Sequence, residues 1–124
     1  MSRWPADRAR IELLRALELH AGAFTVIAAQ SRDWASALFV GARHRLALLI
    51  EGEDAAARAR RLCATLPETE FDLRGGFVAD IQLIVTLVDD RPVLGIDALT
   101  IEEAETLAIR PRAIGFSRDA RRAG

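Results

Sequence analysis

The stretch from Phe77 to Leu99 most constrains the fold, because it predicts two strands that are apolar on both faces. Strands at about 77–88 and 93–99 flank the polar segment DDRP at 89–92, and Pro92 is expected in that loop. Side chains of a strand alternate between its two faces. With Val88 placed opposite Val93, one face is entirely apolar and predicts the core: Ile81, Leu83, Val85, Leu87, Leu94, Ile96 and Ala98.

The second face of this hairpin is not the polar face that a solvated antiparallel sheet presents. Ile84, Val88, Val93 and Leu99 remain among its polar residues, and the segment 34–41 is also apolar on both sides. We therefore expect something to pack on this second face. The candidates are one of the chain's own helices, a second copy of the chain, or a different protein or apolar ligand. Self-association is the commonest external solution. The predicted homodimer interface is Leu38, Val40, Ile84, Val88, Val93 and Leu99.

The remaining patterns predict an α+β domain in which helices pack on an antiparallel sheet of about five strands. Pro5 and Gly22 bound one helical pattern, and a second runs over 53–66 until Pro67. Thr100 and Glu103 match a capping box, which predicts a third, short helix. Further strands are expected at 23–30, 34–41 and 45–50, with a turn at 31–33, so the order is α-βββ-α-ββ-α. A short extra strand near 70–74 is an option, and Gly75-Gly76 reads as a hairpin turn or a bend.

Length and composition favour one domain over 1–109, followed by an arginine-rich tail over 110–124. The longest apolar run has five residues, whereas a membrane span needs about twenty. A single cysteine, Cys63, excludes a disulfide framework, and no secretory signal pattern is present. We expect a cytoplasmic protein. Abundant alanine with no lysine, asparagine or tyrosine is typical of a GC-rich, bacterial coding genome.

Charge is unevenly distributed, with +3 over residues 1–50, −8 over 51–109 and +4 over 110–124. The net charge of −1 argues against a domain devoted to binding polyanions. The tail nevertheless carries five clustered arginines that are candidates for contact with nucleic acid. They are Arg110, Arg112, Arg118, Arg121 and Arg122. Folding back onto the acidic stretch 97–105 is the alternative.

The segment GARHRLALLIEG at 41–52 contains a candidate anion-binding group, Arg43, His44 and Arg45. These side chains converge on a phosphate or carboxylate only if the segment around Gly41 is a loop. In an extended strand, both arginines point to one face and His44 to the other. The polar end of a hairpin is the more economical interpretation, because loop polarity is common.

No pattern predicts a catalytic group, a metal site or a cofactor. Cys63 lies on the buried stripe of a helix, and His20 near a helix end complements its dipole. Asp80 and Asp97 share a face but are expected to lie several residues apart, where each interrupts an apolar patch.

These patterns are compatible with three functions. The first is a non-catalytic homodimeric interaction module. The second is binding of nucleic acid or an anionic ligand through the tail and Arg43/Arg45. The third is a small enzyme with a helix–sheet pocket around His44 and Asp80, although enzymatic activity is disfavoured.

Overall fold

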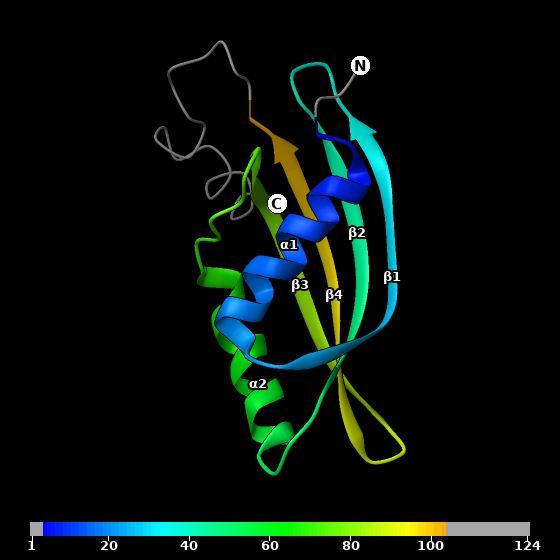
Figure 1. Cartoon of the computed structure of the whole chain (residues 1–124), viewed down its shortest axis with the longest axis vertical. Coiled ribbons are helices and arrows are strands. Elements are labelled where there is room, and N and C mark those ends of the chain that lie inside the picture. The colour runs from blue at the N-terminus through cyan, green and yellow to red at the C-terminus, as the bar shows by residue number, and fades with distance from the viewer. Residues whose placement is uncertain (1–3, 104–124) are drawn as a thin grey trace.

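The computed structural model describes residues 4–103 as two helices packed on one sheet (Figure 1). The elements are α1 (Ala6–Ala21), β1 (Phe24–Ala35), β2 (Val40–Ile50), α2 (Ala55–Thr65), a 3₁₀ turn (Leu66–Glu68), β3 (Gly76–Val88) and β4 (Arg91–Glu102). The sheet is antiparallel with the strand order β1-β2-β4-β3, so β2 and β4 are the central strands. The predicted α+β class is confirmed, and within residues 4–103 the sheet has four strands in place of the predicted five or so.

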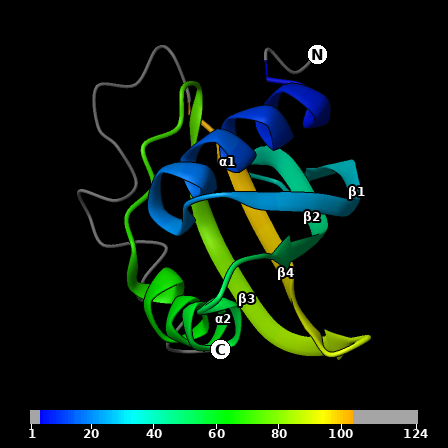
Figure 2. The ribbon, with the colours of Figure 1, turned by 60° about the horizontal axis from the view of Figure 1, so that its bottom comes forward.

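Both helices lie on the same side of the sheet, as Figures 1 and 2 show. We call the helix-covered side the inner face and the opposite side the outer face. One apolar cluster joins Leu13 and Leu17 of α1 and Leu62 of α2 to alternate residues of the central strands. The sheet contributes Leu46, Leu48, Ile50, Ile81, Leu94, Ile96 and Ala98 to that cluster. Burial of each large side chain contributes about 1.5–3 kcal/mol, so this cluster holds the two layers together.

The hairpin β3–β4 confirms the predicted core face but not the predicted register. Val88 pairs with Arg91, and Asp89 and Asp90 form the two-residue turn with φ of 52° and 64°. Two positive φ values are typical of a tight hairpin turn, and aspartate tolerates that conformation. The register is shifted by two residues from the prediction, which leaves every side chain on its predicted face. Pro92 lies within β4 and not in the loop, and Leu87 shares the inner face but is 63% exposed.

The predicted turn at 31–33 is wrong, because β1 continues through it to Ala35. Polar residues are tolerated there since β1 is an edge strand, and Ser31 pairs with a polar residue of β2. The reversal comes later, where the backbone N–H of Ser36 donates to the carbonyl of Phe39 at 2.8 Å. The predicted strand 23–30 is therefore only the first part of β1. The predicted strand 34–41 covers the end of β1, the loop at 36–39 and the start of β2.

The predicted capping box at Thr100 is also wrong. Thr100 is a fully buried residue of β4, paired with Ala42 and Val78, and β4 continues to Glu102. A threonine that pairs on both sides in a central strand has no helix to cap. The rest of the predicted third helix and the tail lie outside the described residues. Near 70–74 the structure has an isolated bridge between Leu73 and Gly76, so no extra strand forms there.

Gly75 and Gly76 allow the chain to enter β3 beneath Trp4. Gly75 has φ +102°, a conformation that favours glycine. A Cβ at Gly76 would lie 2.2 Å from the carbonyl oxygen of Ile101 and 2.3 Å from the Trp4 ring. The glycine pair is thus a tight bend at the start of β3.

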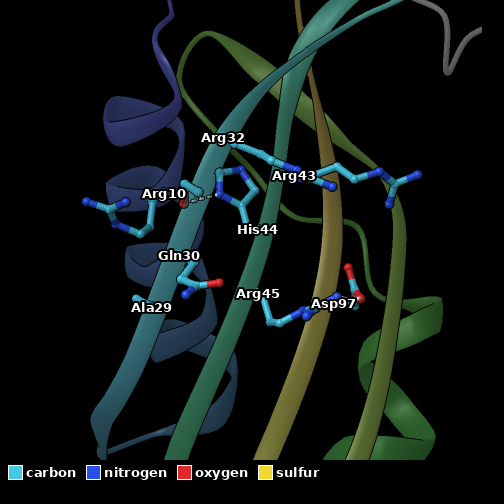
Figure 3. Close-up of a pocket in the computed structure, with 9 residues that line it drawn as sticks. Arg10, Ala29, Gln30, Arg32, Arg43, His44, Arg45 and Asp97 are labelled. Carbon is cyan, nitrogen blue, oxygen red and sulfur yellow. Dashed lines mark hydrogen bonds and ion pairs between the residues drawn. The ribbon is translucent and has the colours of Figure 1, made fainter.

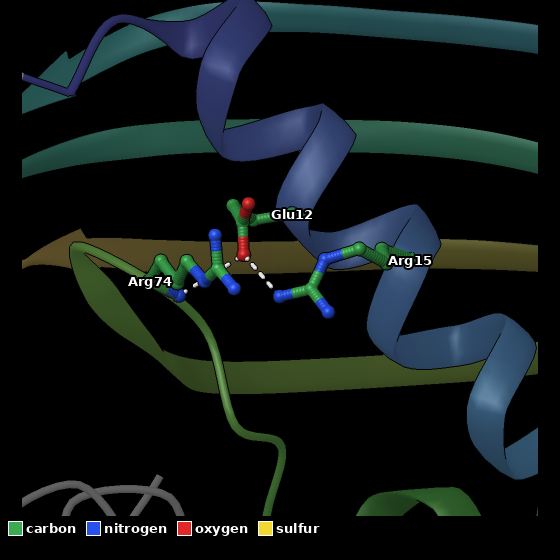
Figure 4. Close-up of polar contacts among 3 residues, drawn as sticks. All are labelled: Glu12, Arg15 and Arg74. Atoms are coloured by element: carbon green, nitrogen blue, oxygen red, sulfur yellow. Dashed lines mark hydrogen bonds and ion pairs between the residues drawn. The ribbon is translucent and has the colours of Figure 1, made fainter.

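Glu12 ties α1 to the loop that precedes β3 (Figure 4). Its Oε1 accepts a hydrogen bond from Arg15 at 2.8 Å and another from the backbone N–H of Arg74 at 3.1 Å. The Arg15 hydrogen bond, followed by that of Arg74, holds the pKa of Glu12 below its ordinary value. The carboxylate therefore stabilises the fold in its ionised form.

We predict that Glu12→Gln lowers the free energy of unfolding by about 1 kcal/mol at neutral pH, because both hydrogen bonds lose their charged acceptor. Urea denaturation measures the change. Glu18→Gln, at an exposed position of the same helix, is the matched control and should alter stability by less than about 0.5 kcal/mol. Equal effects of the two substitutions would contradict the role of Glu12.

Candidate functional site

The outer face of the sheet carries the candidate site, and its side chains form rows that run across all four strands. The first row is Arg32, Arg43, Leu99 and Asp80, in the order β1, β2, β4, β3. The second row is Gln30, Arg45, Asp97 and Gln82. The third row is Ala28, Ala47, Gly95 and Ile84. Two rows of charged and amide side chains thus adjoin a row of small and apolar ones.

The structure separates the three residues of the predicted anion-binding group. Arg43, His44 and Arg45 all belong to β2, so Arg43 and Arg45 are exposed on the outer face while His44 is buried on the inner face. The alternative in which Gly41 opens a loop is wrong. Gly41 lies within β2, opposite Ile101, and a Cβ there would lie 2.0 Å from the carbonyl oxygen of Thr100.

Arg32 replaces His44 as the close neighbour of the two arginines. Arg32 lies directly opposite Arg43, and Figure 3 shows both side chains running in the same direction across the sheet. Neither of them forms an ion pair within residues 4–103. Like charges in directly opposed positions destabilise a sheet. The sequence offered no signal for this neighbour, because Arg32 was placed in a turn.

Arg45 has a partner of its own in the same sheet. Its Nη2 lies 3.8 Å from Oδ2 of Asp97, which is its direct neighbour on β4 (Figure 3). The two side chains are 77% and 47% exposed, so this ion pair contributes little to stability.

A hollow of about 530 Å³ runs along β1 and β2 beside these side chains. Four of its lining residues are arginines, from α1, β1 and β2. The complete lining is Arg10, Ala29, Gln30, Ser31, Arg32, Arg43, His44, Arg45 and Asp97. The lining comes from both faces at the β1 edge, since Arg10 belongs to α1 on the inner side whereas Arg32, Arg43 and Arg45 lie on the outer face. The three outer guanidinium groups suit carboxylate or phosphate oxygens.

Asp80 and Asp97 lie closer together than the sequence predicts. Asp80 pairs with Leu99 and Asp97 with Gln82, so the two aspartates are diagonal neighbours on β3 and β4. The prediction failed because the register is shifted by two residues. The outer face therefore has a basic half (Arg32, Arg43 and Arg45) on β1 and β2 and an acidic half (Asp80 and Asp97) on β3 and β4.

The predicted interface residues lie in several places. Ile84 and Val88 are on the outer face and are 66% and 50% exposed, while Leu99 is half-buried there. Val93 shares that face but is buried. Leu38 lies in the β1–β2 loop, and Val40 begins β2 on the inner side, so neither belongs to the outer face.

His44 is the centre of a buried polar chain that links three strands. Its Nδ1 lies 2.7 Å from Oγ of Ser31, and its Nε2 lies 2.9 Å from Oγ1 of Thr100. Thr100 donates in turn to the carbonyl of Ala42 at 3.4 Å. The Thr100 oxygen then accepts from Nε2–H, and Nδ1 accepts from Ser31, which describes a neutral imidazole.

Burial, together with the positive charge of Arg10, lowers the pKa of His44 to about 4. Unfolded histidine has a pKa near 6.5, so the unfolded chain binds a proton between these values that the folded chain does not. The resulting stability is complete above about pH 6.5 and is lost as the pH falls toward 4. A base this weak, with both nitrogens occupied, is poorly suited to activate Ser31 as a nucleophile.

Cys63 and His20 are the other residues of the described part of the chain that could take part in chemistry. Burial raises the pKa of the Cys63 thiol, which keeps it protonated at neutral pH. His20 lies in the last turn of α1, where its ring meets Phe71 edge-on at 5.3 Å between centroids. Within residues 4–103, no group of three or more His, Cys, Asp or Glu is arranged to hold a metal ion.

The five tail arginines, Arg110 to Arg122, lie outside the described residues. Among the described helices, none combines the length and the apolar character required to cross a membrane. No protein-family model matches the chain, and no curated protein or solved structure is significantly similar to it. Function must therefore be argued from the geometry of the outer face and the polar chain.

We predict that the free energy of unfolding falls by about 3 kcal/mol between pH 6.5 and pH 4 on account of His44 alone. Urea denaturation across this range measures the dependence, and His44→Gln should remove this part of it because glutamine does not titrate. His20→Gln is the matched control and should keep it. The same pH dependence in His44→Gln and in the original chain would refute the assignment.

Proposed function

We propose that this protein acts by association, as a homodimeric module whose outer sheet face is the interface. The proposal is supported by one observation above all. Both helices cover the inner face, which leaves Ile84 66% exposed and Val88 50% exposed on the outer face. A solvated antiparallel face normally alternates to polar residues. A second copy is the simplest cover, because two-fold dimers are the commonest protein assemblies.

The composition of the outer face is also suited to an interface. The row of Ala28, Ala47, Gly95 and Ile84 presents small and apolar side chains that allow a second sheet to approach closely. Two packed sheets lie about 10 Å apart and interdigitate their side chains. The charged rows beside it supply the polar contacts that give such an interface its register.

A catalytic role around His44 and Asp80 is less well supported. His44 is 1% exposed on the inner face, whereas Asp80 is on the outer face, so the sheet lies between them. The polar chain through Ser31 and Thr100 is better explained as a means of satisfying a buried imidazole.

We predict that the wild-type chain sediments as a dimer of its 13.6 kDa subunit and that Ile84→Glu shifts it to the monomer. A carboxylate at this position would be buried without a partner. Analytical ultracentrifugation measures the mass, with circular dichroism to confirm folding. Leu19→Glu is the matched control, because Leu19 is 77% exposed on α1 and should leave the dimer intact. A wild-type chain that stays monomeric at high concentration would end the proposal.

Binding of a small anion in the hollow along β1 and β2 is the second candidate. The observation that favours it is the pair Arg32 and Arg43, which has no ion-pair partner within residues 4–103 and lies next to Arg45 on the outer face. Charge-assisted hydrogen bonds from several guanidiniums select phosphate or carboxylate oxygens.

If the hollow binds anions, inorganic pyrophosphate should bind in isothermal titration at low salt, and Arg43→Glu should weaken binding at least about tenfold through lost and reversed charge. Arg61→Glu, at an exposed position of α2, is the charge-matched control and should bind as the wild type does. Equal binding by both variants, or no heat of binding at all, would exclude this candidate.

A further inference from the structure

We infer that the two copies pack outer face to outer face about a two-fold axis parallel to the strands, so that Arg32 of each copy meets Asp80 of the other. The inference rests on the proposed homodimer and specifies its partner contacts. It follows from the placement of the basic half on β1 and β2 and the acidic half on β3 and β4 of the same outer face.

Two symmetric ways exist to pack one sheet face onto its own copy with the strands of the two sheets aligned. With the axis across the strands, each strand lies over its own copy, and the basic half is buried on the partner's basic half. With the axis along the strands, the order β1-β2-β4-β3 is reversed in the partner, so β1 lies over β3 and β2 over β4. Only the second arrangement places arginines over aspartates in the two charged rows.

The rows then match position by position, because this axis keeps each row at its own level. In the first row Arg32 lies over the partner's Asp80, and Arg43 lies over Leu99 next to it. In the second row Gln30 lies over Gln82 and Arg45 over Asp97. Guanidinium–carboxylate pairs that leave water on association need this kind of direct opposition.

The third row shows the same complementarity in size. Ile84, the most exposed apolar side chain of the face, lies over the partner's Ala28, and Ala47 lies over Gly95. A large side chain opposite a small one lets two packed faces interdigitate. Charge and volume therefore select the same axis.

The arrangement also explains the opposed arginines of the first row. Arg32 and Arg43 face each other without an acid of their own within residues 4–103, at a cost in the isolated chain. In the dimer each pair gains the carboxylate of Asp80 from the other copy. Near the axis, Arg45 and Asp97 of the two copies form a network of four charges.

A charge-reversal mixing experiment tests the inference. Arg32→Asp alone creates two Asp–Asp contacts in its homodimer, and Asp80→Arg alone creates two Arg–Arg contacts. Each variant should raise the dimer Kd at least about tenfold, because opposed like charges at an interface are strongly unfavourable. An equimolar mixture should form heterodimers with a Kd within a few-fold of the wild type, since both contacts again join arginine to aspartate.

Sedimentation equilibrium and native mass spectrometry measure the homodimers and the heterodimer, and Arg61→Asp on α2 is the control that should not change the Kd. If Ile84→Glu dissociates the dimer but the mixture binds no better than the single variants, the axis is wrong and the proposed function stands. If the wild type is monomeric, both the axis and the proposed function fail.

Discussion

The two central strands are buried on one face only, and the position of both helices follows from this asymmetry. In β2 and β4, the even-numbered residues from 42 to 50 and from 92 to 100 point at the helices and are all buried. The odd-numbered residues of the same strands form the outer face. Because side chains alternate along a strand, one set of residues packs on the helices and the other set forms the open outer face.

His44 is the exception within the buried set, and its neighbours show how the fold accommodates it. An unpaired imidazole in an apolar layer is costly, but here Ser31 of the edge strand and Thr100 of β4 occupy both ring nitrogens. The polar chain therefore crosses three of the four strands. Through this chain the stability of the sheet depends on the protonation of His44. Protonation at low pH should therefore destabilise β1 and β2, which carry the basic half of the outer face.

The outer face is better described by its rows than by its exposed apolar residues. The exposure of Ile84 and Val88 is the reason for proposing that another molecule covers the outer face, but it does not specify which molecule. Charge is divided across this face, with the arginines on β1 and β2 and the aspartates on β3 and β4. This division can fix the orientation of a partner, whereas apolar area cannot. The proposed anion binding and the proposed self-association would use the same guanidiniums, so a small anion at high concentration would compete with the carboxylates of a second copy.

The residues that share a face could be predicted from the local pattern alone, because alternation is not changed by a two-residue error in register. This pattern placed Ile81, Leu94 and Ile96 in the core and Ile84 outside, although the predicted pairing was shifted by two residues and β1 was cut short at Ser31. Three other features could not be predicted this way: β4 lies between β2 and β3, Thr100 is a strand residue beside His44, and Arg32 opposes Arg43. These neighbours come from strand pairing between segments far apart in the chain, and no local pattern of residues encodes that pairing.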